Sequence, residues 1–263
     1  MQLPFEFFVM VTSMICNILT IAVYLFVKKL QNTLGKCIMS CLFSMVMAHF
    51  ILVLHKLDVL VEGVSSNIFI FFVIAYVLWL SAISFHLWKS FKSVKKEEDW
   101  YQFLVYSALV WITAAVIIGI RYFMNKFELE NAFVMFRYLG WLLLSIFNLI
   151  MFILTAIHIW KVKRDLKMCT RQEETTTTCL DFDNQTLAIF LRLFVMVDVS
   201  WLIFSIILIV TFFKDVNPFL NLIISVHYFF GIFNFILLVC KRSTIKLIEE
   251  SIRERRPSLK TLY

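Results

Sequence analysis

The sequence is poor in charge and in the residues that interrupt helices. Charged residues make up 16% of its 263 positions, whereas hydrophobic residues make up 61%. A soluble domain carries about a quarter charged residues, so this composition excludes an ordinary soluble fold. Only 5 Gly and 3 Pro are present, which argues against a β-barrel or a loop-rich fold. The sequence therefore predicts an all-α membrane protein.

Several kinds of functional site are missing as well. None of the six Cys residues falls in a segment that we place outside the cell, so no extracellular disulfide framework is expected. His49, His55 and His86 lack metal-ligand spacing, and we find no catalytic constellation and no cofactor site. The net charge of +7 is not gathered into a soluble basic patch, which argues against a nucleic-acid partner. The sequence does not predict an enzyme.

Seven apolar runs approach or exceed the length that crosses a bilayer, which is about 20 helical residues for a hydrocarbon core of roughly 30 Å. Residues 1–242 are therefore predicted to form a seven-transmembrane helix bundle, followed by a cytoplasmic amphipathic helix and tail at 243–263. The predicted spans are 5–27, 37–54, 68–88, 103–120, 136–160, 187–213 and 218–240.

The orientation follows from the distribution of Lys and Arg, which accumulate on the cytoplasmic side of a membrane. With the N-terminus outside, most of the 25 basic residues lie in inner loops and in the C-terminal tail. We therefore expect a multi-pass protein of the plasma membrane, with an extracellular N-terminus and a cytoplasmic C-terminus. The basic residues in predicted outer segments are Lys56, Arg121, Lys126, Arg137 and Lys214.

An amphipathic helix is predicted directly after the seventh span. Ile245, Ile248 and Ile252 recur at the spacing of one helical face, and charged residues occupy the other positions. A helix of this kind lies along the inner leaflet, where basic side chains meet anionic headgroups. Membrane lipids are thus one expected partner.

Polar residues inside the predicted spans are the main candidates for functional roles, because a buried charge in a bilayer costs about 2.5–3.5 kcal/mol on insertion scales. Asp198 and Asn234 lie about 22 Å and about 24 Å inward of the outer ends of the sixth and seventh spans. They are a candidate switch pair, with a plain packing hydrogen bond as the alternative. Asn17, Asn148 and Thr155 are expected to join helices.

Two further groups of residues are candidates. His227 and Tyr228 could line an outward-facing pocket, although a lone His is more often packed in a core. Arg192 lies near the inner end of the sixth span, where either a protein partner or lipid headgroups would satisfy it.

Local strings in the sequence resemble the Methuselah family, which are secretin-like G-protein-coupled receptors of insects. The similarity extends from Tyr24 to Arg242, and Leu34 stands where that family tends to have His. The strings are Tyr24–Asn32 with Gly35–Cys37, Trp79-Leu80 with Phe85–Trp88, Tyr106 with Trp111, Phe147–Ile157 with Val162–Arg164, Phe190–Met196 with Trp201, and Gly231 with Phe235–Arg242.

The resemblance implies a receptor that couples to a heterotrimeric G protein by rearranging its helices in response to an unknown extracellular ligand. It implies a G-protein face made of basic residues at the inner helix ends: Lys92, Lys163, Arg164, Arg192 and Lys241. The family's Cys-rich ectodomain is not expected here, since only 1–4 precede the first span. The family's outer disulfide is not expected either, since Ile68–Phe72 and Arg121–Arg137 contain no Cys.

The sequence leaves two other functions open. The absent ectodomain and disulfide would suit a degenerate seven-helix protein that does not signal. A transporter or channel is less favoured, because Pro218 lies at a helix end and no inverted repeat is visible.

Overall fold

The computed structural model describes residues 5–92, 100–127, 139–157 without 141 and 152, 161, and 228–260. Every regular element within these ranges is a helix, which confirms the all-α class. Four of the helices contain candidate spans, at Phe7–Phe26, Thr33–Lys56, Gly63–Ser90 and Trp100–Met124, and a shorter apolar helix covers Leu142–Ile157. The sixth predicted span and most of the inner loop before it lie outside the described residues.

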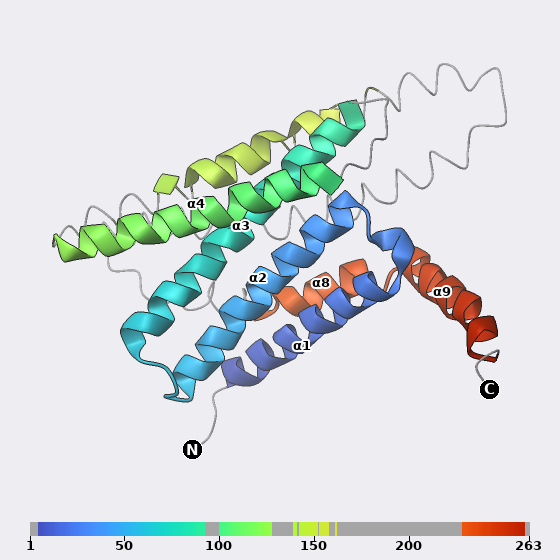
Figure 1. Ribbon diagram of the computed structural model, residues 1–263, viewed down its shortest axis with the longest axis horizontal. Coiled ribbons are helices and arrows are strands. Elements are labelled where there is room, and N and C mark those ends of the chain that lie inside the picture. Colours follow the sequence, from blue (N-terminus) through green and yellow to red (C-terminus); the bar gives the residue numbers. More distant parts are fainter. Residues whose placement is uncertain are drawn as a thin grey trace.

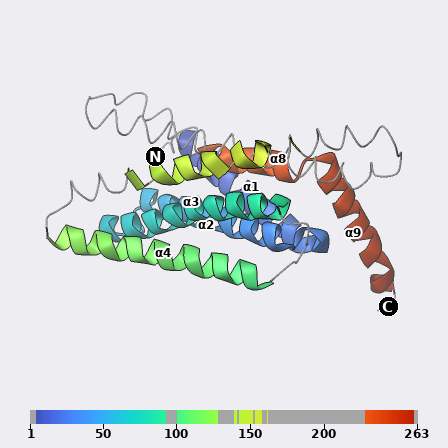
Figure 2. The same ribbon diagram turned by 90° about the horizontal axis from the view of Figure 1, so that it is seen from above.

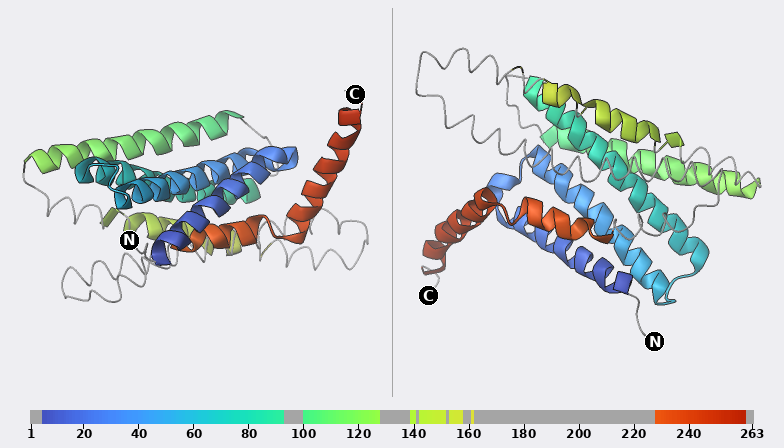
Figure 3. Two further views of the ribbon diagram at one scale, coloured as in Figure 1. Left: turned by 90° about the horizontal axis from the view of Figure 1, so that it is seen from below. Right: turned by 180° about the vertical axis from the view of Figure 1, so that it is seen from behind.

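The first four long helices run in alternating directions along the bundle (Figure 1). The helices in chain order are α1 (Phe5–Phe26), the short 3₁₀ helix η1 (Lys28–Leu30), α2 (Thr33–Lys56), α3 (Glu62–Lys92), α4 (Trp100–Lys126), α8 (Phe230–Leu238) and α9 (Arg242–Lys260). Figure 1 shows α1 to α4 side by side in chain order, and α8 packs against α1. In Figures 2 and 3, α9 turns sharply away from this bundle.

Several helices are longer than the sequence predicts. α3 begins at Glu62 where the prediction begins at 68, and α4 continues to Lys126 where the prediction ends at 120. Arg121, which the prediction places in an outer segment, consequently lies within α4. The prediction followed the apolar run alone, but a helix satisfies its own backbone hydrogen bonds and continues into the headgroup region until a turn residue ends it.

The turn between η1 and α2 is fixed by side-chain capping. Asn32 has an extended backbone, and its side chain accepts a hydrogen bond of 2.8 Å from the Gly35 amide. This satisfies one of the free N–H groups at the start of α2. A Cβ atom at Gly35 would collide with the backbone carbonyl of Leu30, so only glycine fits the close approach of η1 and α2.

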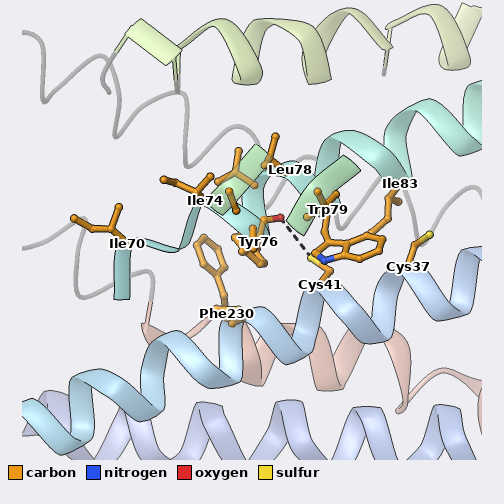
Figure 4. Close-up of a cluster of buried hydrophobic side chains, with 14 of the residues drawn as sticks. Cys37, Cys41, Ile70, Ile74, Tyr76, Leu78, Trp79, Ile83 and Phe230 are labelled. Carbon is orange, nitrogen blue, oxygen red and sulfur yellow. Dashed lines mark hydrogen bonds between the residues drawn. The ribbon is translucent and has the colours of Figure 1, made fainter. Parts of the chain in front are cut away.

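The packed centre of the protein lies between α2, α3 and α4. The Trp79 side chain is fully buried there, with its ring stacked on Phe103 at 6.0 Å and edge-on to Trp111 at 6.4 Å. Figure 4 shows Trp79 among the buried side chains of this cluster, with Cys41 beside Tyr76. The Cys41 thiol lies 3.9 Å from the Tyr76 carbonyl oxygen and donates to it. Since lipid is as apolar as these side chains, close van der Waals packing holds the helices together.

The end of α2 depends on a left-handed residue. Asp58 has φ 55°, and the amides of Asp58 and Val59 donate to the carbonyls of His55 and Leu54 at 3.0 and 3.1 Å. This is the Schellman pattern, in which the left-handed position is usually glycine. An aspartate there is strained, because its Cβ crowds the following carbonyl.

We predict that Asp58→Gly stabilises the protein by up to about 1 kcal/mol, because glycine adopts this conformation without strain. Thermal unfolding of purified protein should show a rise of about 2–4 °C. Asp58→Val should lower the melting temperature, since a β-branched residue tolerates positive φ poorly. A glycine variant less stable than wild type would show that the aspartate side chain itself is needed.

Candidate functional site

A buried polar seam joins α1 to α8. Ser13, Asn17 and Thr20 recur along one face of α1, and all three are fully buried. Gly231 and Asn234 lie three residues apart on α8, and Asn234 is only 4% exposed. Asn234 is the one member of the predicted switch pair within the described residues, since Asp198 lies outside them.

The closest approach in this seam is at Gly231. Its backbone amide donates a 2.9 Å hydrogen bond to Ser13 Oγ. A Cβ atom at Gly231 would overlap both the carbonyl oxygen and the hydroxyl of Ser13, and would lie 2.7 Å from Asn17 Nδ2. Small residues allow two membrane helices to approach in this way, because their backbones then come into direct contact.

Asn17 is buried in this seam with its side-chain amide unpaired. Neither its amide nitrogen nor its amide oxygen has a hydrogen-bond partner there. Other hydroxyls bond within their own helix: Thr20 to the Cys16 carbonyl and Thr155 to the Met151 carbonyl, each at 2.8 Å. The Thr155 hydroxyl is thus satisfied within its own helix, and its predicted role in joining helices stays a prediction. Asn17 lies at the contact of α1 with α8.

The C-terminal half of α2 carries a second group of polar residues. The Tyr228 ring lies edge-on to the buried His49 ring at 6.2 Å, and Lys56 Nζ lies 5.8 Å from the Tyr228 ring centroid. The sequence predicts His227 and Tyr228 as lining an outer pocket. Tyr228 is partly buried against α2, and His227 lies outside the described residues. The contact with His49 was missed because hydropathy does not show which helices are neighbours.

Near this group, the N-terminal end of α3 is linked to the C-terminal end of α4. Arg121 donates from Nη2 to Ser66 Oγ at 3.2 Å, and Ser65 Oγ lies 3.3 Å from His55 Nδ1. The Ser66 hydroxyl accepts from the Arg121 guanidinium, so this bond joins α4 to α3.

At the other end of the bundle, η1 and α9 come together. Lys29 of η1 and Glu250 of α9 form an exposed ion pair of 2.8 Å across 221 residues of sequence. The hydrogen bond with Glu250 raises the pKa of Lys29, and the same bond lowers the pKa of Glu250. Nearby, Lys36 Nζ lies 4.2 Å from the ring centroid of the exposed Trp100 side chain.

The predicted G-protein face is only partly described. Lys92 is the last residue of α3, and Lys241 lies just before α9, where its carbonyl accepts from the Ile245 amide at 2.9 Å. Lys163, Arg164 and Arg192 lie outside the described residues. The described part of the chain therefore does not bring this set of five together.

Comparison with known proteins identifies the relatives of this chain. No family model matches it. The chain is 36% identical over 91% of its length to the probable G-protein coupled receptor Mth-like 12 of Drosophila melanogaster, and 38% identical over 92% to Mth-like 7 of the same species. It is also 35% identical over 93% of its length to the G-protein coupled receptor Mth of Drosophila yakuba.

The chain is a relative of the Methuselah-like receptors. It covers 54%, 54% and 52% of these three proteins, so it spans about half the length of the curated relatives it matches. These Methuselah-like relatives are named as receptors and not as enzymes. With four apolar helices long enough to cross a bilayer, the chain is a multi-pass membrane protein.

Replacing Gly231 by Ala should destabilise this bundle by about 1–3 kcal/mol, because the added methyl group overpacks the contact with Ser13. Gly119 provides a matched control, since a Cβ atom there meets nothing within 4 Å. Gly119→Ala should change stability by no more than about 0.5 kcal/mol. The test compares the thermal unfolding of both variants in one detergent. Equal melting temperatures would contradict the close contact between Gly231 and Ser13.

The ion pair between Lys29 and Glu250 predicts a pH dependence. Its contribution is complete above the ordinary pKa of Glu and below that of Lys, roughly from pH 5 to 10. It is lost as the pH falls through the lowered pKa of Glu250 or rises through the raised pKa of Lys29. Glu250→Gln should therefore show a smaller drop in melting temperature than wild type between pH 7 and about pH 4. The difference should be small and should shrink in high salt, because the pair is exposed. An equal drop in both proteins would mean that the pair does not stabilise the fold.

Proposed function

We propose that the chain is a seven-helix G-protein-coupled receptor of the Methuselah-like type, with an extracellular N-terminus and a cytoplasmic C-terminus. The observation that carries this proposal is the 36% and 38% identity to two Mth-like receptors over 91% and 92% of the chain. The similarity extends across nearly all the predicted spans, not one motif. The accumulation of Lys and Arg in the predicted inner loops supports the orientation.

In the proposed mechanism, ligand binding shifts a population of receptors between two helix arrangements. An unknown extracellular ligand would favour the active arrangement, in which the inner ends of the third, fifth and sixth helices separate to admit a heterotrimeric G protein. The G-protein face would include Lys92, Lys163, Arg164, Arg192 and Lys241. The C-terminal end of α3 and the junction between α8 and α9 lie at the same end of the bundle as η1 (Figure 1). This arrangement suits a G-protein face at that end.

The candidate switch of this receptor is a hydrogen bond between Asp198 and Asn234. Asn234 is almost fully buried on α8, one turn from the contact between Gly231 and Ser13. A bond from the sixth helix to this residue would link the mobile helix to the part of the bundle that α1 and α8 hold together. Breaking it would release the sixth helix.

We expect Asn234→Ala and Asp198→Ala each to raise basal signalling about threefold, since a hydrogen bond between membrane helices contributes about 0.6 kcal/mol. The experiment measures basal cAMP and calcium levels in cells that express each variant at matched surface density. The double variant should signal no more than either single variant, because both remove the same interaction.

Thr155→Ala is the control for this experiment, because the Thr155 hydroxyl bonds within its own helix. It should leave basal output unchanged. If the two single effects add instead, the residues act separately and the switch pair is wrong. Silence of every variant at good surface expression, with each G-protein class supplied in turn, would favour a protein that does not signal.

A further inference from the structure

The turn between α2 and α3 is apolar and uncovered. It consists of residues 57–61, and Asp58 is their one charged member. The side chains of Leu57, Val59 and Val61 are 49%, 64% and 76% exposed. Figure 1 shows this turn at one end of the bundle, beside the start of α1. We call the three exposed apolar side chains the turn patch.

The length of α3 places the turn patch beyond the lipid. α3 has 31 residues and is therefore about 46 Å long, whereas a hydrocarbon core is about 30 Å thick. Lys89, near the C-terminal end of α3, is exposed and belongs at the membrane surface. Counting back about 20 residues from Lys89 ends the core near Phe69, so Val61 lies about 12 Å farther out. Headgroups fill only roughly 5–8 Å of that distance.

A layer of polar contacts marks the level of the headgroups independently. Ser65 Oγ lies 3.3 Å from His55 Nδ1, and Arg121 donates to Ser66 Oγ at 3.2 Å. A guanidinium and an imidazole are costly in hydrocarbon and favourable at the membrane surface. Residues 57–61 connect His55 to Ser65, so the turn lies on the side of this layer that faces away from the hydrocarbon. Lipid therefore does not cover the turn patch.

Asp58 combines backbone strain with an open charge. Its φ of 55° is left-handed, a conformation in which glycine would be relaxed. Its carboxylate has no ion-pair partner within the described part of the chain. Strained residues cluster at ligand contacts, where the surrounding structure holds them for a purpose other than stability. A carboxylate between exposed apolar side chains fits a partner that brings apolar groups and a positive charge together.

The charge of Asp58 selects among the possible partners of the turn patch. A second copy of this chain would bring two Asp58 carboxylates together across a symmetric contact, which is unfavourable. Anionic lipid headgroups would be repelled in the same way. A basic polypeptide would be attracted, and its apolar side chains would gain from covering the valines.

We propose that the turn patch and Asp58 form a docking surface for an extracellular polypeptide segment that carries apolar side chains and a lysine or arginine. The apolar side chains of the partner cover Val59 and Val61, and its cation pairs with the Asp58 carboxylate. The proposal rests on the proposed function for the side of the membrane on which the turn lies. It names the chemical class of the unknown ligand, because exposed apolar patches outside lipid are typical of protein–protein contacts.

The test is selection of a random peptide library on the full chain in phosphatidylcholine nanodiscs, after subtraction on empty nanodiscs. The selected peptides should be enriched in Lys, Arg and apolar residues. Val59→Ser with Val61→Ser should weaken their binding about tenfold, because two apolar contacts are lost. Asp58→Asn should weaken it about fivefold at low salt and less at high salt, since asparagine tolerates the left-handed backbone but carries no charge.

Glu249→Gln is the matched charge control for Asp58→Asn. Glu249 is an exposed acidic residue of α9, at the other end of the bundle from the turn patch. This variant should bind the selected peptides as wild type does. Thermal unfolding shows whether each variant is folded, and Asp58→Asn should melt no lower than wild type.

Two results would overturn the proposal. Peptides that bind the serine and asparagine variants as tightly as wild type would show that they dock elsewhere on the protein. A selection that yields acidic or uncharged peptides would show that the Asp58 carboxylate does not choose the partner. Binding is measured without signalling, so a peptide that docks at the turn patch and leaves cAMP and calcium unchanged would contradict the proposed function alone.

Discussion

The absence of water from the bilayer core is the constraint on which the rest of this structure depends. Each backbone group inside it must find a partner within the protein, so helices are the only choice for a chain of this composition. The same constraint governs the polar side chains. Ser44, Ser81 and Ser84 donate to the carbonyl four residues earlier at 2.9, 3.2 and 2.9 Å. Their hydroxyls are satisfied locally, and the helix surfaces stay compatible with lipid.

Polar groups meet between two helices where α1 packs on α8. Gly231 supplies a backbone donor to Ser13, and Asn17 retains an amide with no partner among the described residues. This contact attaches α8 to α1, and the ion pair of Lys29 and Glu250 attaches α9 to η1. α8 and α9 are therefore attached to α1 and η1, while α1 also packs along α2.

Hydropathy predicted the helical class and the existence of the described spans, because the burial of a segment in lipid depends on how apolar that segment is. It could not predict where Glu62 and Arg121 would lie, since a helix ends by turn geometry and not by the end of its apolar run. Asn234 was identified because a polar residue stands out in an apolar span. Its neighbours Ser13 and Gly231 were missed, because helix pairing depends on shape between segments more than 200 residues apart. The spacing of Ser13, Asn17 and Thr20 on one face was the available signal.

The buried tryptophan of the bundle has an optical consequence. Trp79 and Trp111 belong to α3 and α4, and their rings lie 6.4 Å apart at an angle of 75°. Two indole chromophores held this close, at fixed orientation in a rigid apolar setting, couple their electronic transitions. The protein therefore carries its own label for the packing of α3 on α4. Its near-ultraviolet circular dichroism would report loss of that packing even where helix content stays constant.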